Sequence, residues 1–323
     1  TGNLGAGYEL GLLGDVDEYY VSEEFLAEKA LEFSQTDSTF DDSTFFDEYE
    51  NEKSFHALFR LRKEIYDYSK LGGVYSDVRI RDSFSRTYGI DGDLLIAGEY
   101  SLSFQALHSE TNDMILNYKN DPAFFLNLFR GSRTFNFQLS YTDIFPDFEM
   151  ANGFMTRDPD YREISGQLWY DIRSDDSFIY LLRPALYVTQ MYNHDENEPV
   201  KNGRKIESYL SPSIQLQTRG QFTLSGGYFR QFEDYLGYGF DLNQYLVSFS
   251  SQTIPWFYAF GTFFWGDGIY YDAVYEGREP FLGNTHTINW GLEFKPISQW
   301  ATRLSGNHYV FDGTYEDINT RVI

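Results

Sequence analysis

The segment "TFNFQLSYTDI", Thr134 to Ile144, alternates apolar and polar side chains along most of its length. One set is Phe135, Phe137, Leu139 and Tyr141, and the other is Asn136, Gln138, Ser140 and Thr142. A period of two is typical of a β-strand with one apolar and one polar face. Whether the apolar face meets a protein core or lipid decides the fold.

The same pattern recurs in "REISGQLWYDIR" (162–173), "KIESYLSPSIQLQT" (205–218) and "TINWGLEFKP" (287–296). Strands are predicted wherever it occurs. The expected ranges are 2–13, 54–65, 70–80, 86–97, 100–110, 123–130, 133–144, 161–173, 178–192, 205–218, 221–231, 244–252, 256–265, 285–296 and 300–310.

The connections between these segments differ in length in a regular way. Tight turns with Gly, Asp or Ser alternate with longer loops, apart from one short connection at "RDSFS". The expected long loops are 14–53, 111–122, 145–160, 193–204, 232–243 and 266–284. In an up-and-down meander this alternation puts the turns at one end and the loops at the other, as in outer-membrane barrels.

Composition narrows the class of protein further. The 323 residues include 27 Tyr and 30 Phe, a bias that favours strands, and no Cys, which excludes disulfides and thiolate metal sites. A net charge of −24 repels phosphate backbones, so nucleic acid is not an expected partner. No apolar run approaches the ~18–20 residues of a membrane-spanning helix.

The polar residues of each strand cannot build an apolar core, whereas the opposite residues are heavily aromatic. We therefore predict an all-β fold, a transmembrane antiparallel up-and-down β-barrel of about 16 or more strands with short periplasmic turns and long extracellular loops. It spans 1–323 and lies in the outer membrane of a Gram-negative bacterium. Because such barrels have even strand numbers, and "INTRVI" reads as the start of a returning strand, we expect a fragment that lacks C-terminal strands.

The stretch from Phe137 to Tyr170 resembles a bacterial outer-membrane family. The resemblance is carried by Tyr141, Asp143, Pro146, Phe148, Gly153, Phe154, Arg157 and Arg162, with weaker support from "TGNLGAGYELGLL" and "SRTYGIDGDLLI". Members of that family carry an N-terminal domain similar to family-9 carbohydrate-binding modules, followed by a β-barrel domain of unknown function. The resemblance implies an outer-membrane barrel and a missing N-terminal domain. It implies no catalytic residues.

The long loop 14–53 is strongly acidic. It holds fourteen Asp and Glu against two Lys, a net charge of −12 and half of the total. A solvated extracellular loop is the favoured interpretation. Calcium binding through carboxylates is the alternative, with Asp41, Asp42, Asp47 and Glu48 as the candidate ligands, and no other cofactor is expected. Within the loop, "SEEFLAEKALEF" predicts a short amphipathic helix near 23–33.

The segment "GDGIYYDAVYEG", Gly266 to Gly277, combines carboxylates with tyrosines. This composition suits sugar binding and equally suits an extracellular aromatic girdle, which we favour. The five histidines show no helical metal-ligand spacing, and Ser305 and His308 differ by three positions and so face opposite sides of a strand. We expect no enzymatic activity.

Strand parity predicts a set of lumen-facing charges. They are Arg60, Arg62, Asp91, Asp93, Glu163, Asp171, Arg173, Arg183, Glu207, Glu293, Lys295 and Arg303. In a porin they set the charge of the pore, whereas in a closed barrel they pair across the lumen.

Two functions follow from these expectations. The first is porin-like passage of small solutes, with saccharides suggested by the family resemblance. The alternative is a membrane anchor or scaffold with a blocked barrel that displays a carbohydrate-binding or partner-binding domain. The expected partners are outer-membrane lipid, a saccharide or other small solute, and a partner protein.

Overall fold

The computed structural model describes residues 2–5, 7–18, 53–66, 68–81, 83–112, 118–151, 157–194, 202–313 and 317–322. Within these ranges the protein is built of strands that belong to one sheet, with one 3₁₀ helix and no α-helix. The all-β prediction is therefore confirmed. No helix among the described residues has the length and apolar character needed to cross a membrane.

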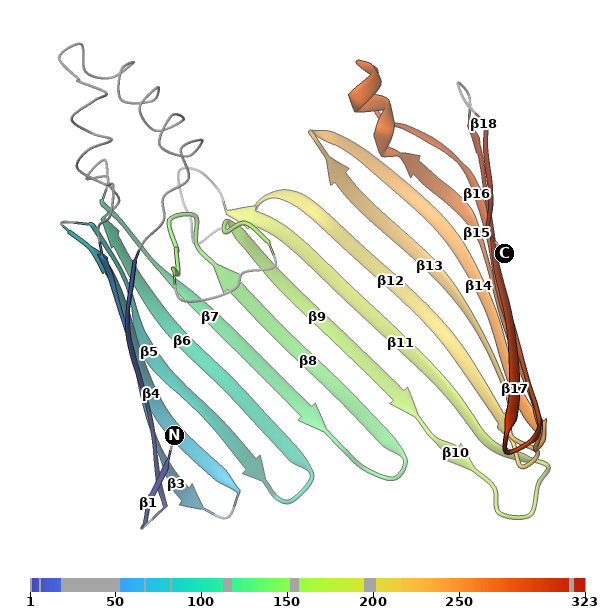
Figure 1. The fold of residues 1–323 in the computed structure, drawn as a ribbon, viewed down its shortest axis with the longest axis horizontal. Coiled ribbons are helices and arrows are strands. Elements are labelled where there is room, and N and C mark those ends of the chain that lie inside the picture. Colours follow the sequence, from blue (N-terminus) through green and yellow to red (C-terminus); the bar gives the residue numbers. More distant parts are fainter. Residues whose placement is uncertain are drawn as a thin grey trace. The chain divides into compact units, whose positions relative to one another are not determined.

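The strands follow one another along the chain and pair mostly with their sequence neighbours, in antiparallel fashion (Figure 1). Their bounds are β1 Gly2–Gly5, β2 Tyr8–Glu18, β3 Lys53–Tyr66, β4 Ser69–Ile80, β5 Ser83–Ile96, β6 Tyr100–Asn112, β7 Tyr118–Arg130, β8 Phe135–Ile144, β9 Tyr161–Tyr170, β10 Ile172–Arg173, β11 Ile179–His194, β12 Asn202–Thr218, β13 Phe222–Tyr235, β14 Tyr238–Ile254, β15 Phe257–Tyr270, β16 Phe281–Ile297, β17 Trp300–Gly313 and β18 Asp317–Val322. The 3₁₀ helix η1, Tyr271–Glu276, connects β15 to β16.

The chain divides into two compact units. Unit one comprises 1–128 and 141–162, and unit two comprises 129–140 and 163–323. In unit one β2 to β7 form a meander, and in unit two β11 to β18 form another. Most of these strands have 10 to 17 residues, which meets the ~9–11 that a tilted strand needs to cross a bilayer.

The burial of the two faces is the reverse of that in a soluble sheet, because apolar side chains are exposed and polar side chains are buried. On β8 the side chain of Leu139 is 51% exposed, whereas that of Asn136 is 5% exposed. Across the described residues, 49 large hydrophobic side chains are exposed and 14 hydrophobic residues are buried. Soluble monomers rarely expose contiguous apolar surface on this scale. The apolar face therefore lacks a protein layer to cover it.

The predicted strand 2–13 is wrong, because two strands occupy this region. β1 and β2 form an antiparallel pair in which Gly5 lies opposite Tyr8. The chain reverses at Gly7, whose φ of 76° is accessible to glycine without strain. The alternation of "GNLGAGYELGLL" continues through the turn and conceals it.

The predicted long loop 232–243 is also wrong. β13 and β14 are joined by the two residues Leu236 and Gly237, with φ values of 52° and 86°. Positive φ at both central positions is the mark of a type I′ hairpin. The backbone N–H of Gly237 also donates to the Asp234 side chain at 3.2 Å. Leucine is rarely found at positive φ, so the turn gave no clear sequence signal.

Other boundaries shift by several residues. β15 extends to Tyr270 and β16 begins at Phe281, so the loop predicted at 266–284 is shortened. β2 extends through Gly14 to Glu18, which shortens the predicted acidic loop, and its remainder, with the predicted helix near 23–33, lies outside the described residues. The expected returning strand at the end of the chain is confirmed, because β18 pairs with β17.

The inverted faces generate the first prediction. Leu139→Arg and Leu168→Arg place a charge on the exposed apolar face, at a cost of about 2–4 kcal/mol if that position lies at the bilayer midplane. Gln138→Arg and Gln167→Arg place the same charge on the polar face and serve as matched controls. We expect the leucine variants to fold poorly into lipid vesicles and the glutamine variants to fold normally, as measured by heat-modifiable migration in gels. Equal folding of both sets would favour a soluble sheet.

Candidate functional site

The predicted lumen charges share one face within each unit. In unit one the register aligns Arg62 with Gly72 and Gly72 with Asp91, so β3, β4 and β5 present these three positions to the same side. In unit two the register aligns Glu293 with Arg303, so β16 and β17 present these two residues to one side. We call this side the polar face.

Asp91 is the centre of the ion pairs in unit one. Its Oδ2 accepts from Arg60 Nη2 at 2.6 Å and from Arg62 Nε at 2.7 Å, and Arg62 also reaches Asp93 at 3.1 Å. The Arg62 side chain crosses Gly72 to make these contacts. A Cβ at position 72 would lie 2.5 Å from Arg62 Cγ and 3.0 Å from Asp91 Oδ1, so glycine is required there.

Asp171 has the same role in unit two. Its carboxylate is almost fully buried and accepts from Arg183 Nε at 2.5 Å and from Arg173 Nη2 at 2.7 Å. A buried carboxylate is costly without such partners. Farther along the sheet, Arg303 donates to Glu293 at 2.6 Å.

These ion pairs run along the wall of the sheet. Arg60 and Asp91 have one strand between them. Arg173 on β10 and Arg183 on β11 both pair with Asp171. Glu293 and Arg303 lie on adjacent strands. The pairing partners described here are thus at most two strands apart in the sheet. The pairs fix the long side chains against the wall.

An in-folded segment, residues 145–151, is the most distinctive feature of the polar face. It follows β8 and crosses the neighbouring strands in reverse order (Figure 1). Phe145 N donates to Pro122 O on β7 at 3.3 Å, and Asp147 N donates to Asp121 Oδ2 at 2.7 Å.

The next contacts of the in-folded segment lie on β6 and β5. Glu149 N donates to Ser109 Oγ at 3.0 Å, and Ala151 N donates to Ser85 Oγ at 3.3 Å. Ser109 is fully buried and itself donates to Asp121 O. Because the backbone N–H groups of Asp147, Glu149 and Ala151 each meet a polar side chain of the wall, the polar face provides partners that an irregular segment needs.

Phe148 anchors the in-folded segment. Its side chain is 2% exposed and packs with Leu107, Ala123 and Ile144, which come from β6, β7 and β8. The flanking Asp147 and Glu149 are exposed. The segment thus holds an apolar side chain against the wall and presents two carboxylates on its open side.

The sequence prediction for this connection was incomplete. The predicted loop 145–160 matches the gap between β8 and β9, but we expected the whole loop to lie beyond the ends of the strands. An available signal was Phe148 itself, a large apolar residue between acidic residues in a loop. Folding back onto the protein removes the apolar surface of such a residue from water.

The aromatic and acidic residues of the segment Gly266–Gly277 do not converge. Tyr270 is buried with Ala273 and Phe311, while Tyr275 is 88% exposed. Tyr271 donates to Glu233 Oε1 at 2.9 Å, and burial together with this carboxylate raises the pKa of Tyr271. These contacts secure η1 on the end of the sheet.

The proposed calcium ligands Asp41, Asp42, Asp47 and Glu48 lie outside the described residues. Within the described ranges, no group of three His, Asp or Glu side chains is placed to hold a metal ion.

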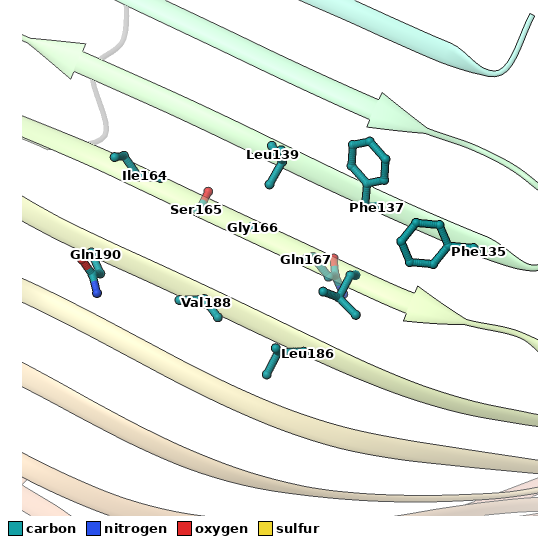
Figure 2. A pocket seen from close by; sticks show the side chains of 11 residues that line it. Phe135, Phe137, Leu139, Ile164, Ser165, Gly166, Gln167, Leu186, Val188 and Gln190 are labelled. Carbon is teal, nitrogen blue, oxygen red and sulfur yellow. The ribbon is translucent and has the colours of Figure 1, made fainter.

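The apolar face of unit two carries a groove of about 550 Å³. Figure 2 shows its walls on β8, β9 and β11, formed mainly by Phe135, Phe137, Leu139, Ile164, Leu186 and Val188. Gly166 forms part of the floor, and a Cβ there would lie 3.2 Å from Leu139 Cδ2. Its lining suits hydrocarbon and offers few partners to a polar ligand.

The chain matches no protein-family model and no curated protein. Among solved structures it is similar to OpdO of Pseudomonas aeruginosa, with 11% identity, a TM-score of 0.46 and coverage of 84% of this chain and 87% of that chain. OpdL of the same organism matches at 9% identity and a TM-score of 0.46, with 98% and 97% covered. OccAB2 of Acinetobacter baumannii matches at 10% identity and a TM-score of 0.45, with 83% and 87% covered.

These three proteins are outer-membrane porins. The family expected from the stretch Phe137–Tyr170 remains a prediction.

The anchoring of the in-folded segment can be tested by Phe148→Ala. Removing a buried Phe side chain costs about 3–5 kcal/mol, so local opening should become at least about 100-fold more frequent. We expect the amides of Asp147 and Glu149 to exchange hydrogen correspondingly faster, as measured by hydrogen–deuterium exchange of the folded protein. Phe55→Ala, whose side chain is 47% exposed on β3, is the control and should leave these amides unchanged. Unchanged exchange in Phe148→Ala would show that the segment is held by other contacts.

Proposed function

We propose that the chain forms an outer-membrane β-barrel that allows small hydrophilic solutes to pass. The observation that carries this proposal is the inversion of the two faces, with large apolar side chains exposed and polar groups such as Asp91, Ser109 and Asp171 buried. Lipid is the surrounding that stabilises such an apolar face, and water or ions are what a polar face requires.

A closed barrel is the form of this sheet that a membrane permits. An open edge would leave backbone N–H and C=O groups unpaired in hydrocarbon, at several kcal/mol each. About 16 or more strands enclose more space than the side chains of the wall fill, which favours a water-filled lumen. In this proposal the polar face lines the lumen and the in-folded segment 145–151 narrows it.

The charges on the polar face favour cations. Many of its Arg side chains are held by carboxylates on nearby strands, as at Asp91 and Asp171. The exposed carboxylates of Asp147 and Glu149 lie on the segment that narrows the lumen. Local negative charge raises the concentration of cations, and the effect weakens as salt rises.

A second function is supported by the same ion pairs and by the resemblance of Phe137–Tyr170. Wall-bound arginines and the in-folded segment reduce the open cross-section of the lumen. In the alternative, the barrel is blocked and anchors a carbohydrate-binding or partner-binding domain. The two functions differ in whether the inserted protein conducts ions.

Conductance in planar bilayers tests both functions. We expect the purified full-length protein to open channels that prefer K⁺ over Cl⁻, measured as a reversal potential in a KCl gradient. The double variant Asp147→Asn/Glu149→Gln should lower this preference, and higher salt should lower it in the wild-type protein. Asp175→Asn/Asp176→Asn, in the tight turn after β10, removes the same charge away from the segment and should have a smaller effect. A correctly inserted protein without conductance would overturn the porin proposal and favour the anchor.

The orientation in the membrane gives a separate prediction. Tight turns should face the periplasm and the longer connections the cell exterior. Gly220→Cys lies in the turn between β12 and β13, where the site of a Cβ is at least 3.6 Å from its neighbours, and Asp272→Cys lies on the exposed side of η1. An impermeant thiol reagent on whole cells should label position 272 and leave position 220 unlabelled. The reverse pattern would show the opposite orientation.

A further inference from the structure

We infer that a cavity on the polar face of unit two is a binding site for neutral saccharides. The cavity has a volume of about 480 Å³ and is lined by side chains of β9, β11 and β12. Its principal members are Gln167, Tyr187, Thr189, Glu207, Tyr209 and Ser211. This inference rests on the proposed function, because it names the class of solute that the polar face admits.

Two tyrosines form the aromatic part of the cavity. The ring centroids of Tyr187 and Tyr209 are 5.6 Å apart, and the ring planes meet at 62°. Two rings at this angle give an apolar corner against which the C–H face of a pyranose can pack. The tyrosine hydroxyls add polar groups to the same surface.

The aromatic surface continues beyond the cavity along the polar face. Tyr209 lies 5.7 Å from Phe229, and Phe229 lies 6.3 Å from Phe264, measured between ring centroids. The register places these rings on the same side of β12, β13 and β15. These rings offer successive packing positions to an oligosaccharide.

The polar part of the lining selects the charge of the ligand. Glu207, Gln167 and Ser211 present carboxylate, amide and hydroxyl oxygens that accept hydrogen bonds from sugar hydroxyls. Thr189 donates to Glu163 at 3.2 Å, so a second carboxylate adjoins the cavity. The described lining contains neither Lys nor Arg, and these carboxylates repel anionic ligands. A neutral saccharide therefore fits this chemistry better than a uronate.

Maltotriose is a suitable neutral probe. Its binding to the full-length protein in detergent micelles can be measured by isothermal titration calorimetry. We expect the double variant Tyr187→Ala/Tyr209→Ala to weaken binding by about tenfold or more, because it removes both rings of the aromatic corner. Tyr228→Ala/Tyr245→Ala removes another neighbouring tyrosine pair, with centroids 5.2 Å apart on the opposite face, and should leave binding unchanged.

Two further variants separate the cavity from a general loss of folding. Tyr209→Phe keeps the ring and should retain most of the affinity. Glu207→Gln removes the negative charge with little change in shape, and should raise the relative affinity for trigalacturonate, the anionic comparison ligand. Heat-modifiable migration in gels verifies folding of every variant.

The outcomes distinguish this inference from the channel proposal. Ion conductance without binding of maltotriose, cellotriose or chitotriose overturns the saccharide inference and leaves the channel intact. Saccharide binding that depends on Tyr187 and Tyr209, without conductance, supports the saccharide site and overturns the channel. Equal weakening by the Tyr228/Tyr245 pair would also overturn the inference, because binding would not be located in the cavity.

Discussion

The constraint on which this structure depends is the alternation of side chains across an antiparallel sheet. Each strand sends successive residues to opposite faces, so a strand that carries Leu139 on one side must carry Gln138 and Ser140 on the other. Where the strands place most of their large apolar residues on the bare side, their polar residues meet one another on the opposite side. Ion pairs, hydroxyl bonds and buried carboxylates then replace the hydrophobic core of a soluble domain.

The features of the polar face follow from that constraint. Arg62 reaches Asp91 because Gly72 leaves the space between them open, and Asp171 is stabilised by two arginines. The same wall of polar groups accepts the backbone of the in-folded segment, which would have no partners on the apolar face. One apolar anchor, Phe148, and a few hydrogen bonds are sufficient to hold the segment there.

The two units contribute different chemistry to the proposed passage. Unit one provides the in-folded segment with its exposed carboxylates, and unit two provides the cavity at Tyr187 and Tyr209 with its row of rings. Both present acceptor oxygens and negative charge. This combination is consistent with neutral or cationic solutes and argues against anionic ones.

The sequence by itself determined the all-β class, most strand positions and which face each strand residue occupies, because a period of two is a local property. It also identified Arg62, Asp91 and Asp171 as residues of the polar face, although not their partners. The tertiary structure decided the rest. The hairpin at Leu236 depends on a backbone conformation that leucine seldom adopts. The in-folded segment depends on contacts such as Ala151 with Ser85, 66 residues apart, and the cavity depends on the register of β11 with β12. Such long-range contacts leave no periodic trace in the sequence, because they form only after the strands have aligned.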